Sequence, residues 1–209
     1  MEPRKIYQVL KEKIIWLEIL PEATLNLTEL ANEFGVSRTP IKEALLLLEV
    51  DDWILHNNAH FLVTPLSIDR IKDITEIRSA MEVHATVWAM ERISPGELNE
   101  LIQLREEISE LDDAATMKKM LELDFKFHRM IYRATKNNQV AQLLERILGH
   151  HLRFWLASPQ EVPRRKFFDE TLRIIQGIEA RDEDKVKAAA LAHIRATVDD
   201  LRRNFLRQE

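Results

Sequence analysis

Residues 27–49 read LTELANEFGVSRTPIKEALLLLE. Two short stretches with helical spacing of apolar residues lie on either side of Gly35. A glycine at this point permits the tight turn that joins the two helices of a helix-turn-helix motif. Ser37 is a residue type that caps helix starts, and Pro40 is tolerated in a first turn, so the second helix is expected to begin near residue 37. The stretch therefore predicts a helix-turn-helix.

The flanking sequence completes a small domain around this motif. Residues 4–17 have apolar side chains at helical spacing, and Pro21 ends that pattern. After the motif, WILH at 53–56 and HFLVT at 60–64 are typical of two short strands around a tight turn. We therefore predict a winged helix-turn-helix domain over residues 1–66, with three helices followed by a hairpin.

From Ser67 onward the periodicity is helical to the end of the chain. Breaks at Pro, Gly, Asn and Asp predict helices over residues 67–92, 94–111, 114–135, 138–157, 162–180 and 182–207. Helices of roughly 20 residues are long enough to enclose a buried interior. The expected fold is mainly α, with an all-α bundle of six to seven helices in residues 67–209.

Composition excludes several classes of protein. None of the 209 residues is cysteine, which rules out disulfides and thiolate metal sites and suits a reducing cytoplasm. The four glycines are scattered, so the glycine-rich loops that bind nucleotide phosphates are absent. No uncharged run approaches the roughly 18 residues that span a bilayer, so no membrane partner is expected.

Side chains suited to DNA stand at the start of the second helix of the motif, the end that such motifs place in the major groove. Arg38 and Lys42 can reach phosphates or guanine edges, and the hydroxyls of Ser37 and Thr39 can reach phosphates or bases. His60 at the wing is a further candidate contact. Residues 1–68 nevertheless carry six cations and ten carboxylates, so binding to DNA is expected to be weak and sensitive to salt.

The segment FGVSRTPIKEALLLLE at 34–49 resembles the recognition segment of the GntR family of bacterial transcription regulators, and VTPLS at 63–67 resembles the end of that family's wing. A winged helix followed by a helical bundle resembles the FadR subfamily with its FCD-type effector domain, and the resemblance covers essentially the whole chain. It implies a repressor or activator that binds a palindromic operator as a homodimer. It also implies a small organic acid as effector of the bundle.

Several positions depart from the family pattern. Lys42 stands where the family usually has Arg, which keeps the charge but loses the bidentate fork. Ala59 and His60 replace an Arg-Gly pair at the wing tip. Asp52 and Glu22 stand where the family has glycine.

The expected helix that contains MLELDFKFHRMI, residues 120–131, places a carboxylate and an imidazole, Asp124 and His128, on an otherwise apolar face. His193 lies on an apolar face of the last helix. Because buried polar groups are costly unless paired, these groups are expected to meet one another or a ligand. Carboxylate and neutral imidazole suit a divalent transition metal such as zinc or nickel.

Metal-binding FCD domains, by resemblance, use an Asp-x-x-x-His pair and two further histidines. Asp124, His128 and His193 match three of these positions, and Thr171 stands at the fourth. The prediction is a metal site of three protein ligands, completed by water or an effector oxygen. The alternative is a hydrogen-bonded Asp–His–Thr network without metal.

Arg78 and Thr171 are the candidate effector contacts. The guanidinium fork of Arg78 matches a carboxylate, although an ion pair with Glu82 four residues on would also explain it. Two other functions compete with the regulator. One is a metal-dependent enzyme on the bundle, for which no HExxH motif or clearly placed general base is found. The other is a ligand-binding or scaffold protein that no longer binds DNA.

Overall fold

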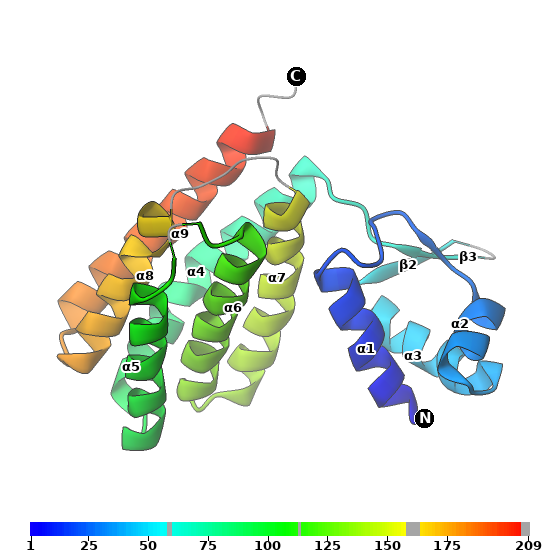
Figure 1. Cartoon of the computed structure of the whole chain (residues 1–209), viewed down its shortest axis with the longest axis horizontal. Helices are drawn as coiled ribbons and strands as arrows, with labels where there is room; N and C mark the ends of the chain where they lie inside the picture. The colour runs from blue at the N-terminus through cyan, green and yellow to red at the C-terminus, as the bar shows by residue number, and fades with distance from the viewer. Residues whose placement is uncertain (58–59, 113, 158–163, 206–209) are drawn as a thin grey trace. The chain divides into compact units, whose positions relative to one another are not determined.

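The computed structural model describes residues 1–57, 60–112, 114–157 and 164–205, with backbone alone for 164–165 and 197–205. The chain forms two compact units, Met1–Arg70 with Leu152–Ala157 and Ile71–His151 with Ser158–Glu209. The first holds three helices and a small sheet, and the rest is helical (Figure 1), so the predicted fold class is confirmed. No helix in the described ranges is long and apolar enough to span a bilayer.

The first unit is a winged helix-turn-helix. Its elements are α1 (Pro3–Ile15), β1 (Thr24–Leu25), α2 (Leu27–Phe34), α3 (Arg38–Val50), β2 (Ile54–Asn57) and β3 (His60–Val63). The sheet is antiparallel with the order β1-β3-β2, in which Thr24 pairs with Leu62 and Ile54 pairs with Val63. The periodicity did not predict β1, because two residues are too few to show alternation.

Local signals explain where the helices of the motif begin and end. The Asn26 side chain caps α2 by accepting hydrogen bonds from the backbone N–H groups of Thr28 and Glu29 at 2.8 and 3.3 Å. Gly35 ends α2 with a left-handed φ of 64°, which glycine adopts without strain. Ser37 does occupy the N-cap position of α3, but its side chain makes no capping hydrogen bond.

The two positions where the family has glycine are both left-handed. Glu22 has φ 65° and Asp52 has φ 66°, a region in which a Cβ atom costs free energy. The Glu22 N–H donates to the Val63 carbonyl at 2.9 Å, and the Arg70 guanidinium donates to the Asp52 carbonyl at 3.0 Å. The same guanidinium forms an ion pair with the Asp52 carboxylate. These contacts hold the turns although neither residue is a glycine.

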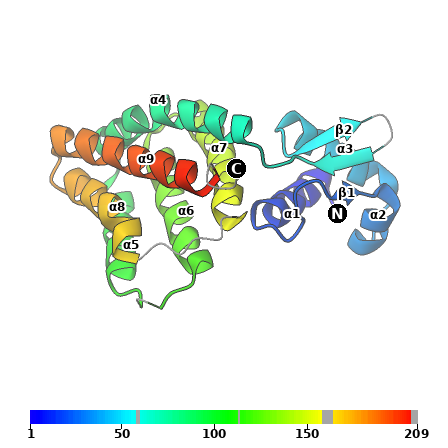
Figure 2. The ribbon, with the colours of Figure 1, turned by 90° about the horizontal axis from the view of Figure 1, so that it is seen from above.

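The remaining helices are α4 (Ile68–Arg92), α5 (Pro95–Ser109), α6 (Met117–Ala134), α7 (Asn138–Ala157), α8 (Arg164–Glu179) and α9 (Glu183–Phe205). Each agrees with its sequence prediction to within a few residues. Figures 1 and 2 show α8 and α9 side by side. Their close approach depends on Gly177, where a Cβ atom would lie 2.8 Å from Cγ2 of Val186.

The second unit is closed by contacts between helix ends. Arg92 at the end of α4 donates to the Thr135 carbonyl at 2.8 Å, and Arg181 donates to the carbonyl of Met90. The interior of this unit is an apolar core, and it receives side chains from α4, α5, α6, α7, α8 and α9. The inner face of α6 supplies Phe127, fully buried, and also the polar residues described below.

Candidate functional site

The start of α3 is exposed in the first unit. Ser37, Arg38, Thr39 and Lys42 are all exposed, as is His60 at the start of β3. No hydrogen bond or ion pair joins these five side chains to another described residue. They are therefore available to a ligand as the sequence predicts, although availability does not by itself assign their roles.

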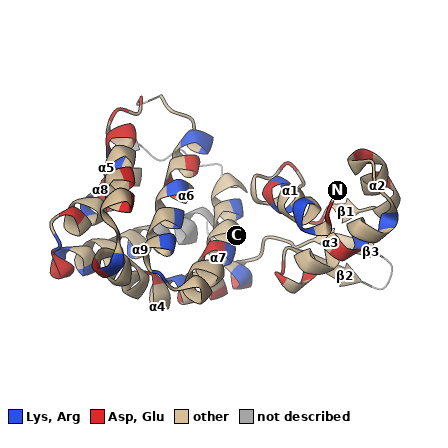
Figure 3. Cartoon of the chain, turned by 90° about the horizontal axis from the view of Figure 1, so that it is seen from below, with Lys and Arg blue, Asp and Glu red and all other residues tan. Residues whose placement is uncertain are grey.

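Farther along α3 the outward face changes from polar to apolar. Leu46, Leu47 and Val50 are 42%, 39% and 77% exposed, while Leu45 and Leu48 of the same leucine run are buried. Helical spacing accounts for this division, because only two of the four consecutive leucines can face the core. In Figure 3 the helices of this unit carry both basic and acidic segments. The basic residues of α3, Arg38 and Lys42, both lie in its first two turns.

A polar chamber lies in the interior of the second unit. It is formed by Arg78 and Glu82 on α4, Asp124, His128 and Tyr132 on α6, and His193 on α9. On α6 the three residues are spaced four apart, which aligns them along one face of the helix. All six side chains are largely buried, and that of Asp124 is the most exposed of them, at 14%.

The two histidines face each other through the same kind of nitrogen. Nε2 of His128 lies 3.2 Å from Nε2 of His193 and 3.7 Å from Oδ2 of Asp124. Two nitrogens bound to one tetrahedral zinc ion at about 2.1 Å would be about 3.4 Å apart. Oδ1 of Asp124 is buried and has no hydrogen-bond partner among the described residues, which leaves it available to a cation. The spacing and the donor set both fit a divalent metal.

Glu82 is also close to the two histidines. One ligand atom each from Glu82, His128 and His193 can be chosen so that all lie within 4.8 Å of one another. Glu82 is, however, already bound by Arg78, whose Nε and Nη2 atoms lie 2.6 and 3.2 Å from its two carboxylate oxygens. The ion pair considered as the alternative explanation of Arg78 is therefore present. An effector carboxylate at Arg78 would have to share or displace Glu82.

Burial determines the protonation of the chamber. It lowers the pKa of His128 to about 3 and that of His193 to about 4, so both rings are neutral at pH 7. Neutral imidazole is the form that binds metals. Burial also raises the pKa of Asp124 to about 7, against the opposing effect of Arg78. Burial opposes the ionisation of Glu82 too. The positive charge of Arg78 outweighs this effect and lowers the pKa of Glu82 to about 2.

Thr171 on α8 is fully buried, and its Oγ1 has no hydrogen-bond partner among the described residues. A buried hydroxyl without a partner is costly, so this atom is a candidate contact for a ligand or water. His150 and His151 on α7 are also buried. Burial lowers the pKa of His151 well below its ordinary value and so favours the neutral ring.

Sequence reasoning gave Glu82 only a secondary place and overlooked Tyr132. Both could have been found from helical spacing, since Glu82 follows Arg78 by four residues and Tyr132 follows His128 by four. The Tyr132 hydroxyl donates to Oε1 of Glu82 at 2.7 Å and lies 3.4 Å from Nδ1 of His128. A tyrosine in an apolar stripe is usually core, which is why spacing alone gave it no role.

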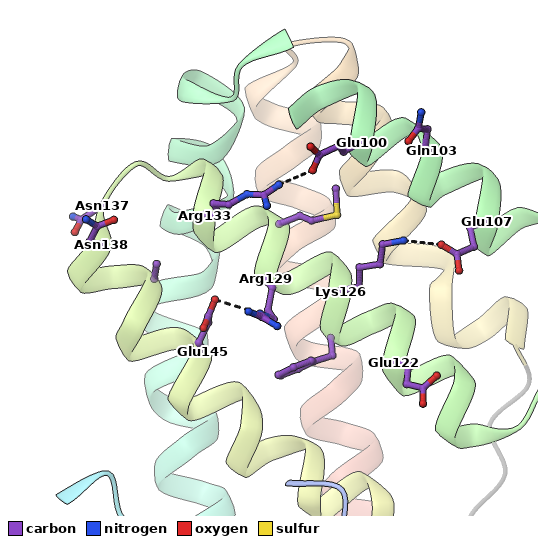
Figure 4. Close-up of a pocket in the computed structure, with 13 residues that line it drawn as sticks. Glu100, Gln103, Glu107, Glu122, Lys126, Arg129, Arg133, Asn137, Asn138 and Glu145 are labelled. Atoms are coloured by element: carbon purple, nitrogen blue, oxygen red, sulfur yellow. Dashed lines mark hydrogen bonds and ion pairs between the residues drawn. The ribbon is translucent and has the colours of Figure 1, made fainter. Parts of the chain in front are cut away.

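A separate groove of about 730 Å³ lies between α5, α6 and α7. Figure 4 shows its basic residues on α6 paired with acidic ones on the flanking helices: Lys126 with Glu107, Arg129 with Glu145 and Arg133 with Glu100. None of the chamber residues lines it. The cations of the groove are already paired with carboxylates. Its ion pairs connect α6 to α5 and α7, and it is not the site of the predicted chemistry.

Comparison with known proteins identifies both parts of the chain. Residues 3–58 match the model of the gntR family of bacterial regulatory proteins, and residues 73–196 match the FCD domain. The chain therefore belongs to the GntR family of regulators with a C-terminal FCD domain. It is a DNA-binding transcription regulator.

Relatives agree along nearly the whole length. The chain is 28% identical over 202 residues to the HTH-type transcriptional regulator YdhC of Bacillus subtilis, covering 95% of this chain and 90% of that protein. It is 28% identical over 186 residues to the Nta operon transcriptional regulator of Aminobacter aminovorans, covering 87% and 85%. These names and the family matches indicate a regulator and not the enzyme that was considered as the alternative.

Solved structures show the same fold. The structure of McbR/YncC from Escherichia coli superposes with a TM-score of 0.84 at 20% identity, covering 97% of this chain and 98% of that one. A GntR regulator from Rhodococcus superposes with a TM-score of 0.77 at 14% identity, covering 95% and 96%. At these identities the likeness supports the fold and does not transfer a ligand.

Proposed function

We propose that the protein is a cytoplasmic, ligand-responsive repressor or activator that binds a palindromic operator as a homodimer. A two-fold dimer presents two winged domains to two half-sites, which is the geometric reason for a palindrome. Residues 1–66 are proposed as the DNA-binding domain and residues 67–209 as the effector and dimerisation domain. In the first, Ser37, Arg38, Thr39, Lys42 and His60 are the proposed DNA contacts.

The chamber is the proposed effector site. Asp124, His128 and His193 would hold a divalent transition metal, which would supply a Lewis-acidic centre for an oxygen ligand. A small carboxylate metabolite is the proposed effector. The guanidinium of Arg78 and the hydroxyl of Thr171 would hold it. The first is a cation that matches a carboxylate, and the second is a buried donor with no partner among the described residues.

One observation carries the metal proposal: the 3.2 Å spacing of the two Nε2 atoms of His128 and His193, with a carboxylate oxygen of Asp124 beside them. In a metal-free network, one of these nitrogens must donate a proton to the other, and Oδ1 of Asp124 has no partner in the part of the chain that the structure describes. A cation between the three side chains satisfies all of them. Neutral rings and an adjacent carboxylate are the donor set that zinc and nickel accept.

Mass spectrometry of the purified chain tests the site. The wild type is expected to carry about one metal ion per chain, and His128→Ala and Asp124→Ala are expected to lose it. The matched control is His84→Ala, which removes an exposed imidazole from α4 of the same unit. Metal content that stays unchanged in His128→Ala would remove the site as described.

A gel-shift experiment tests the regulator model. Duplex DNA from the region upstream of the gene is expected to bind with a two-step or cooperative pattern, and added carboxylic acids are expected to weaken the complex. Arg78→Ala should bind the DNA but lose the response to the acid. Failure to bind any specific duplex at low salt would leave the DNA contacts proposed here without support.

A further inference from the structure

The two ring nitrogens of His128 face different surroundings. Nε2 faces Asp124 and His193, which are the other proposed metal ligands. Nδ1 faces the opposite side, where the Tyr132 oxygen lies at 3.4 Å and Oε2 of Glu82 lies at 3.8 Å. The tautomer of the His128 ring therefore decides which side receives the lone pair.

Glu82 limits how the protons on the Nδ1 side can be arranged. Its carboxylate can only accept hydrogen bonds, and Arg78 already donates two to it. The Tyr132 hydroxyl at 2.7 Å must then be the donor to Oε1 of Glu82. With its proton directed at Glu82, the Tyr132 oxygen presents lone pairs toward Nδ1 of His128. That arrangement favours a proton on Nδ1 and a free lone pair on Nε2.

We propose that Tyr132, held by Glu82 and Arg78, is a positioning residue that sets the tautomer and ring orientation of His128 for the metal. The inference rests on the metal site of the proposed function. Histidine ligands of metals commonly donate their other N–H to an outer partner, and loss of such partners typically weakens metal binding 10–100-fold. The same chain of contacts joins Arg78, the proposed effector contact, to His128 through two side chains.

Packing alone does not explain Tyr132. Its ring is buried and its centroid lies 5.7 Å from that of His128, so Phe would fill the same space. Its hydroxyl adds a hydrogen bond from α6 to Glu82 on α4, which Phe could not make. Tyr132→Phe therefore removes the positioning contact and keeps the shape of the core, while Arg78 still pairs with Glu82.

The test is cobalt(II) binding by the full chain, measured by competition with a chelator and by the visible spectrum of bound cobalt. Tyr132→Phe is expected to bind cobalt 10–100-fold more weakly, with an altered spectrum. The matched control is Tyr7→Phe, which also removes a tyrosine-to-carboxylate hydrogen bond, to Asp51 at 2.5 Å, but in the first unit. Tyr7→Phe is expected to bind cobalt as the wild type does. Equal affinity in the Tyr132→Phe and wild-type chains would overturn the proposal.

Nitrogen-15 NMR of the metal-free chain gives a second readout that needs no metal. The His128 ring of the wild type should be protonated at Nδ1, and Tyr132→Phe should shift the population toward the other tautomer. A wild-type ring protonated at Nε2 overturns the proposal without any variant. If the wild type binds no cobalt, the metal part of the proposed function fails, and this tautomer measurement alone decides whether Tyr132 orients His128.

Discussion

His128 on α6 and His193 on α9 are 65 residues apart in sequence, and their Nε2 atoms lie 3.2 Å apart in the interior of the second unit. Nitrogens this close either share one proton or bind one cation. Three proposed protein ligands, Asp124, His128 and His193, surround that point, and by resemblance Thr171 stands where metal-binding FCD domains have a histidine. The strength of the site should therefore respond to what stands at Thr171.

The substitution Thr171→His is expected to tighten metal binding. It supplies the fourth neutral nitrogen that metal-binding FCD domains have, by resemblance, at this position. A gain of about tenfold, equivalent to about 1.4 kcal/mol, is expected in competition with a chelator. Thr171→Val is the control, because it removes the hydroxyl at nearly constant volume and adds no ligand. Equal affinity in the Thr171→His and Thr171→Val chains would show that position 171 does not reach the metal.

Lys42→Ala should weaken DNA binding and reduce its dependence on salt. If the Lys42 ammonium neutralises one phosphate, the slope of log affinity against log salt should fall by about 1. Fluorescence anisotropy at several salt concentrations measures this slope. Lys72→Ala removes the same charge from an exposed position on α4 and should leave the slope unchanged. A slope that does not change in Lys42→Ala would exclude a phosphate contact by this residue.

Glu22→Gly should stabilise the first unit. Glu22 has a left-handed φ of 65°, which costs a residue with a Cβ atom roughly 1–2 kcal/mol, and the greater freedom of glycine in the unfolded chain offsets part of the gain. A net stabilisation of about 0.5–1 kcal/mol is expected. Hydrogen exchange of the Val63 amide, which donates to the carbonyl of Ala23 next to Glu22, reports it. Glu18→Gly, at a residue without a positive φ, should have the opposite sign.

Acid should weaken the contact between α5 and the turn after α6, because this contact depends on the ionised carboxylate of Glu97. A hydrogen bond from Lys136 lowers the pKa of Glu97 from 4.5 to about 2, against the opposing effect of burial and with further help from Ser94. Because the folded pKa is lower than the unfolded one, this contribution is complete above about pH 5 and is lost as the pH falls toward 2. The Lys136 ammonium lies 2.6 Å from both Glu97 oxygens.

Glu97→Gln is the corresponding variant. Its unfolding free energy, measured by urea titration between pH 2 and pH 6, should change less steeply with pH than that of the wild type. Glu106→Gln, an exposed position on the same helix, should keep the wild-type slope. If Glu97→Gln keeps that slope too, the Lys136 contact does not persist in solution.

Most of the architecture was predictable because its signals are local. Gly35 ends α2, Pro and Gly mark the start of α5, and the apolar periodicity of α6 shows its buried face. The spacing of Asp124 and His128 in the same helix was enough to indicate a polar site. Their assignment to a metal also needed the family resemblance, since an Asp-x-x-x-His pair is found in ordinary helices.

What the sequence by itself determined is therefore the order of helices, the helix-turn-helix and the residues that face inward, because each depends on neighbours within a few positions. Only the tertiary structure decided which inward groups meet. It brought Tyr132 to Glu82 across 50 residues and His193 to His128 across 65. Such pairings depend on how helices pack, and packing responds to the whole core, which no local pattern contains.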